Sequence, residues 1–122
     1  MTTDTITLQQ ELEQFIGTEQ YHFNPLYQWM KYTDGVKYFA TNAGGGAYWL
    51  LDIIGTELQP LARKHRFMTV DLRVHANESC DIVVTDGNDS ELWAKRVSFT
   101  DCPKGDWRFF LQSGVLMLTS EY

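Results

Sequence analysis

The second half of the chain alternates β-rich runs with short groups of turn-forming residues, and no other feature constrains the fold as much. Five runs are rich in β-branched and aromatic residues, at 67–75, 80–85, 91–100, 107–112 and 115–119. The connections between them are much shorter than the dozen residues that a parallel crossover needs, so neighbouring strands are expected to be antiparallel. The pattern predicts a five-stranded antiparallel β-meander.

Two amphipathic helices are expected to precede these strands. The first has apolar residues at helical spacing from Leu8 to Ile16 and ends at Gly17. The second runs over 47–58 and is closed by Pro60. Both helices are expected to pack on one face of the sheet. The sequence thus predicts a single α+β domain over 1–122, with a helical, aromatic-rich half at about 1–60 and a sheet half at about 66–120.

The segment between the two helices has two interpretations. Asp34-Gly35, between the runs 29–32 and 36–40, is typical of a β-hairpin turn. Apolar residues at positions 36, 39, 40 and 43 also fit a helix that begins near Asp34. We favour an N-terminal, aromatic-rich hairpin.

Charge and composition exclude several classes of protein. The net charge is −6, and residues 1–60 carry seven acids against two bases, so direct binding to a nucleic-acid backbone is not expected. No apolar run reaches the roughly 20 residues of a membrane span, and the first residues lack the pattern of a signal peptide, so a cytoplasmic location is expected. Cys80 and Cys102 are expected to be reduced thiols. The cysteines and three histidines lack metal-ligand spacing, and no cofactor is expected.

No catalytic signature is present, but one polar group could carry chemistry. The triple glycine at 44–46 lacks the Gly-Lys-Ser/Thr of a phosphate-binding loop, and neither cysteine has the setting of a nucleophile. Glu19 and His22 lie in an aromatic segment without obvious turn chemistry, and Asp52 lies on the polar side of the second helix. If the protein is an enzyme, these three residues are the candidate catalytic residues, with the Glu–His pair as general base and acid.

Aromatic residues are dense between positions 21 and 49, where nine rings occur in 29 residues. A domain of this size cannot easily bury all of them, and surface tyrosine and tryptophan are enriched at interfaces. The candidate partner-binding residues are Tyr21, Tyr27, Trp29, Tyr32, Asp34, Tyr48 and Trp49.

Several short motifs hold more specific residues than core packing requires. They are GTEQY at 17–21, YTDGVKY at 32–38, GAYWLLD at 46–52, DGN at 86–88, FTDCP at 99–103 and SEY at 120–122. As an ordered set, the motifs resemble a family of small proteins of unknown function, found mostly in bacteria, their plasmids and phages. Cys102, where the family usually has an aromatic residue, and Thr119, where proline is common, depart from its pattern. The resemblance implies no activity.

The expected function is therefore that of a protein-binding module, and its expected specific form is a phage or plasmid inhibitor of a host defence protein. The first alternative is a small enzyme or small-ligand binder. The second is an acidic mimic of DNA that would need a row of exposed carboxylates from Glu11, Glu13, Glu19, Asp34, Asp52 and Glu57. A homodimer through the sheet or its edge is also expected, because apolar strand residues such as Phe110, Leu116 and Leu118 cannot all face the helices.

Overall fold

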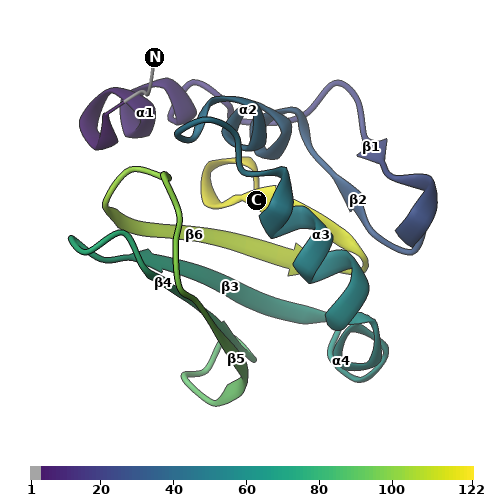
Figure 1. Ribbon diagram of the computed structural model, residues 1–122. Coiled ribbons are helices and arrows are strands. Elements are labelled where there is room, and N and C mark those ends of the chain that lie inside the picture. The colour runs from purple at the N-terminus through teal and green to yellow at the C-terminus, as the bar shows by residue number, and fades with distance from the viewer. Residues whose placement is uncertain (1–3) are drawn as a thin grey trace.

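The computed structural model describes residues 4–122, which form four α-helices and a seven-stranded sheet (Figure 1). The helices are α1 (Thr5–Leu12), α2 (Asp34–Asn42), α3 (Tyr48–Glu57) and α4 (Gln59–Lys64). The strands are β1 (His22–Phe23), β2 (Lys31–Tyr32), β3 (Phe67–Val74), β4 (Cys80–Thr85), β5 (Glu91–Val97), β6 (Gly105–Gln112) and β7 (Val115–Leu118). Two short 3₁₀ helices, η1 (Pro25–Tyr27) and η2 (Thr119–Glu121), complete the fold. None of the helices in 4–122 is long and apolar enough to cross a membrane.

The α+β class is confirmed, but the predicted meander is wrong. The strand order is β1-β2-β7-β6-β3-β4-β5, so β6 pairs with β3 instead of with β5. The chain returns from β5 through residues 98–104 and places β6 near the centre of the sheet. Trp107, Phe109 and Leu111 of β6 are buried there, whereas β5 stays at the edge with exposed charges. Burial of apolar area favours the central position for the more apolar strand.

Two short strands were not predicted, and one of them makes the parallel pair of the sheet. β1 pairs with β2 in antiparallel orientation, and β2 runs parallel to β7 with Lys31 beside Val115. The other strand pairs are antiparallel, as the short connections predicted. The sheet is therefore mixed.

The hairpin turn predicted at Asp34-Gly35 is wrong, because a helix begins there. Thr33 caps α2, and its Oγ1 accepts a hydrogen bond from the N–H of Val36 at 3.3 Å. Asp34 lies in the first turn, where a negative charge interacts favourably with the helix dipole and stabilises the helix. The positions at helical spacing are buried, namely Val36, Phe39 and Ala40. An aromatic hairpin does form, but from β1 and β2.

Two helix boundaries also differ from prediction. α1 ends at Leu12, four residues before the predicted end, and Ile16 is exposed. Pro60 follows the end of α3 as predicted, but it also lies in the first turn of α4, where its missing N–H costs nothing. That short helix was not predicted.

The helices lie on one face of the sheet, and the core forms between them (Figure 1). Phe39 of α2 packs against the rings of Trp107 and Phe109, with centroids 5.4 and 5.0 Å apart. α3 adds Leu50, Leu51 and Ile54, a buried stripe that the helical spacing predicted. α1 contributes one fully buried side chain, Leu8.

Candidate functional site

The N-terminus of α2 gathers polar groups from two of the motifs, GTEQY and YTDGVKY, together with His22. The Asp34 carboxylate accepts hydrogen bonds from the Glu19 N–H at 3.0 Å and from His22 Nε2 at 2.8 Å. The Asp34 N–H donates to Thr18 Oγ1 at 2.9 Å. The hydrogen bond from His22, followed by that from Glu19, lowers the pKa of Asp34. The segment around positions 18–22 is thereby fixed to the first turn of α2.

The candidate catalytic residues Glu19, His22 and Asp52 each make a hydrogen bond with another residue. No hydrogen bond joins any two of their side chains within residues 4–122. His22 pairs with Asp34, and the Asp52 carboxylate accepts a hydrogen bond from the Tyr27 hydroxyl at 2.7 Å. Burial and the Asp52 hydrogen bond raise the pKa of Tyr27, so the phenol stays protonated.

The candidate partner-binding residues divide by exposure. Tyr21 and Tyr48 are exposed, at 59% and 41%. Tyr27 and Tyr32 are buried, and Trp29 and Trp49 are half-buried. These residues lie in or next to β1, η1, β2 and α3, and Figure 1 shows where β1, β2 and α3 lie. The aromatic density between 21 and 49 therefore serves both core and surface.

Sequence reasoning missed two exposed apolar residues beside Tyr21. Phe23 is 54% exposed on β1, and Leu26 is 88% exposed on η1. We name Tyr21, Phe23 and Leu26 the hairpin surface. Asn24 is the signal that could have located it, because Asn followed by Pro is typical of the start of a helical turn.

The hairpin surface lies on a backbone that is held in place. The Asn24 side chain accepts a hydrogen bond from the Leu26 N–H at 2.9 Å. Tyr27 is bonded to Asp52 of α3, and Trp29 Nε1 donates to the Gly55 carbonyl at 2.7 Å. A glycine is needed at position 55 for Tyr27 to pack against α3, because a Cβ there would enter the Tyr27 ring. The segment is therefore fixed to α3.

The acidic residues of the N-terminal half do not all serve one surface. Of the six carboxylates that a DNA mimic would use, three make hydrogen bonds or ion pairs with other side chains. Asp34 pairs with His22, Asp52 with Tyr27, and Glu57 with Lys95 at 2.9 Å. Glu19 is exposed beside the hairpin surface.

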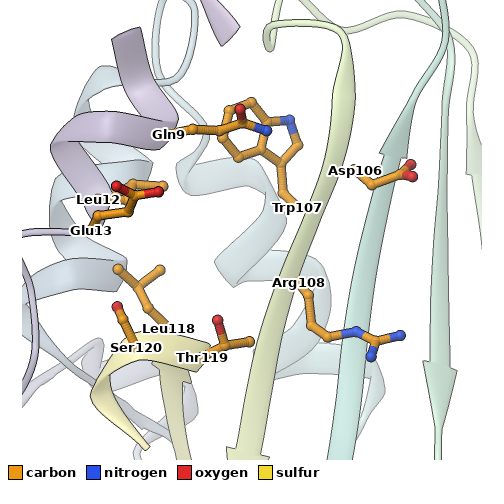
Figure 2. A pocket seen from close by; sticks show the side chains of 9 residues that line it. All are labelled: Gln9, Leu12, Glu13, Asp106, Trp107, Arg108, Leu118, Thr119 and Ser120. Carbon is orange, nitrogen blue, oxygen red and sulfur yellow. The ribbon is translucent and has the colours of Figure 1, made fainter. Parts of the chain in front are cut away.

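A shallow hollow of about 300 Å³ lies between α1 and the sheet (Figure 2). Trp107, Leu12 and Leu118 form its apolar part, and Gln9, Glu13, Thr119 and Ser120 its polar part. Figure 2 shows Asp106 and Arg108 pointing away from it, beyond β6. The indole N–H of Trp107 is already bonded to the Pro103 carbonyl at 3.0 Å. None of the candidate catalytic or partner-binding residues lines this hollow.

The triple glycine has an internal partner. The Gly45 N–H donates to Asp101 Oδ2 at 2.7 Å, so a carboxylate of the chain occupies the position that a bound anion would take. A side chain at Gly45 would collide with the same carboxylate. The close approach of the FTDCP motif therefore explains Gly44 and Gly45, whereas Gly46 has a positive φ of 121° that favours glycine.

Neither thiols nor metal ligands form a reactive site in the part of the chain that the structure describes. Cys80 and Cys102 are both buried and make no disulfide. Burial raises the pKa of both thiols, that of Cys102 to about 12. No cluster of three or more metal-ligating side chains occurs among residues 4–122.

One known protein family matches nearly the whole chain. The profile described as "Family of unknown function (DUF6876)" matches residues 6–122. The chain belongs to this family. A search of the curated proteins found no match, and neither did a search of the solved structures. Family membership agrees with the resemblance in its coverage of nearly the whole chain and in the unknown function of the family, and it assigns no activity.

Proposed function

We propose that this protein is a protein-binding module that contacts its partner through the hairpin surface. One observation carries the proposal: Tyr21, Phe23 and Leu26 expose 59%, 54% and 88% of their surface within six residues of sequence. Single exposed apolar side chains are ordinary, but three large ones on one short segment are typical of an interaction site. Hydrogen bonds to α3 already hold the segment, so little conformational entropy is lost on binding.

The partner in this proposal has a basic surface. The hairpin surface is accompanied by the exposed carboxylates of Glu19 and Asp52, and residues 1–60 carry seven acids against two bases. Opposite charge steers association and disfavours acidic partners. Nucleases hold nucleic acid with basic surfaces of this kind. An inhibitor of a host defence nuclease is therefore the specific form of the proposal.

The test compares a double variant with a matched control in bacterial lysate. Phe23→Ser with Leu26→Ser removes two of the three apolar side chains of the hairpin surface, and Phe99→Ser removes a ring that is 65% exposed outside it. We expect one protein of the lysate to be captured in equal amounts by the wild type and by the Phe99→Ser control. The double variant is expected not to capture it. The captured protein, once purified, is expected to bind the double variant at least about 10-fold more weakly by calorimetry.

Salt dependence tests the charge of the partner separately. Affinity for the purified partner is expected to fall as salt rises from low to high concentration, because opposite charges are screened. If Phe99→Ser weakens binding as much as the double variant does, the hairpin surface is not the contact. If affinity is independent of salt, the partner is not recognised by charge.

A second candidate function rests on the His22–Asp34 pair. Asp34 fixes the imidazole through Nε2, the arrangement by which a carboxylate orients a catalytic histidine. The other ring nitrogen, Nδ1, makes no hydrogen bond within residues 4–122 and is not buried. A small ligand could accept or supply a proton there. Screening small molecules by nuclear magnetic resonance, with His22→Gln as control, tests this: a ligand that shifts the His22 ring signals and no longer binds the variant would support it.

A further inference from the structure

The sheet face opposite the helices carries a row of ion pairs. Asp71 of β3 receives two hydrogen bonds from Arg108 of β6, at 2.7 and 2.9 Å, and lies 3.9 Å from Arg73. On the next strands, Asp81 receives two from Arg96, at 2.8 and 3.0 Å. The strand register places these residues on the side away from the core, and we name this side the open face.

The carboxylates of this row are covered and the guanidinium groups are exposed. The Asp71 and Asp81 side chains are 9% and 27% exposed, whereas those of Arg73, Arg96 and Arg108 are 50%, 67% and 56% exposed. Asp106 lies opposite Arg73 in the register. On the strands of this row three arginines therefore face three aspartates, and His75 also contacts Asp81 at 2.8 Å, in a protein whose net charge is −6.

An apolar cluster adjoins the ion pairs on the same face. The rings of Phe67, Phe110 and Tyr122 lie with centroids 5.1 to 5.7 Å apart. Met117 lies opposite Phe110 in the register and is partly exposed, and Tyr122 is 69% exposed. Of the apolar residues expected to face away from the helices, Phe110 does so, while Leu116 and Leu118 are buried in the core.

We propose that the open face is the contact surface of a homodimer. Its charges balance, so two copies can meet there without the repulsion that two acidic helical faces would cause. Its alternating charges can also pair with those of a second copy, and the apolar cluster supplies a hydrophobic part.

The size of the open face approaches what such a contact needs. Its five strands have four to eight residues each, with a mean length of about 22 Å, and at a spacing of about 4.8 Å they span about 24 Å. This footprint of roughly 500 Å², increased by the relief of the side chains, approaches the roughly 800 Å² that each partner buries in a stable complex. An isologous dimer uses one such patch twice.

Light scattering on purified protein at micromolar concentration tests the proposal. The wild type is expected to have twice the chain mass of 14.1 kDa. Met117→Asp places a charge in the apolar cluster and is expected to raise the dissociation constant at least about 100-fold, giving the monomer mass. Leu26→Asp, the same kind of change on the hairpin surface, is expected to leave the dimer intact.

Circular dichroism must show that each variant is folded. If Met117→Asp is unfolded, Tyr122→Asp, at a more exposed position, replaces it in the test. A wild type of 14.1 kDa overturns the dimer. A dimer that persists in a folded Met117→Asp and in Tyr122→Asp overturns the open face as its contact. Because partner capture depends on Leu26 and dimer formation on Met117, the two proposals can fail independently.

Discussion

Glu121 closes the first turn of α2 from the far end of the chain: its Oε2 accepts a hydrogen bond from the Gly35 N–H at 3.1 Å. Its Oε1 accepts two more, from Thr33 Oγ1 at 2.6 Å and from the Leu118 N–H at 3.0 Å. A Cβ at Gly35 would collide with this carboxylate and with Leu118, so the glycine and the glutamate require one another. The YTDGVKY and SEY motifs are thus held together by hydrogen bonds, and we name this contact the joint.

Glu121→Ala is expected to lower the free energy of unfolding by about 2 kcal/mol. The variant loses three hydrogen bonds and a negative charge at a helix N-terminus, and it leaves the Gly35 N–H without its partner. Urea unfolding followed by circular dichroism measures the change. Glu13→Ala, at an exposed glutamate just after α1, is the control and should change stability by less than about 0.5 kcal/mol. Equal effects in the two variants would show that the joint contributes nothing.

Gly55→Ala is expected to destabilise the protein by about 1–3 kcal/mol, although alanine is the better helix former. The added methyl group would enter the ring of Tyr27, which is held between Asp52 and the core. Gly17→Ala is the matched control, because no atom lies within 4 Å of the position of its Cβ. Thermal unfolding compares the two. If the Gly55→Ala protein is as stable as the wild type, the segment around Tyr27 can move to make room for the methyl group. The hairpin surface would then not be held in place before binding, as the proposed function requires.

Local pattern predicted the elements of this fold better than their arrangement. The five β-rich runs all became strands, since β-branched and aromatic alternation is a local signal. The pairing of β6 with β3 depends on competition between strands for the centre of the sheet, and no local pattern encodes that. At Asp34 a local signal existed: Thr33 and Asp34 form a helix cap, but the Asp-Gly turn pattern competed with it.

The candidate site was predictable only in part, because exposure and pairing are tertiary properties. His22 was recognised as a polar residue without turn chemistry, but its partner is Asp34, which sequence reasoning assigned to a turn. Tyr27 was taken as a contact residue, yet it is buried and its hydroxyl is bonded to Asp52. Leu26 is the most exposed large apolar side chain of the described residues, and Asn24-Pro25 indicates the helical turn that holds it but not the extent of its exposure.

The two thiols are expected to resist modification in the folded protein. Both are buried, and burial raises the pKa of each, so little reactive thiolate forms at pH 8. Labelling with a chromogenic disulfide reagent should be at least about 100-fold slower in buffer than in denaturant, because it requires opening of the structure. Rapid labelling of one cysteine in buffer would identify an accessible thiol and reopen the question of a nucleophile.

The open face predicts how stability responds to acid. Hydrogen bonds from Arg96 and then from His75 lower the pKa of Asp81 to about 2. In the unfolded chain an aspartate titrates near about 4, so between these values the unfolded state binds more protons and stability falls as the pH falls. The Asp81 side chain is 27% exposed, so solvent screening limits the loss from this group to about 1 kcal/mol.

Urea unfolding between pH 6 and pH 2.5 should show a shallower decline in the free energy of unfolding for Asp81→Asn than for the wild type. Asp106→Asn removes a carboxylate of the same face that makes no hydrogen bond within residues 4–122, and a slope changed equally in both variants would contradict the role of the Arg96 pair.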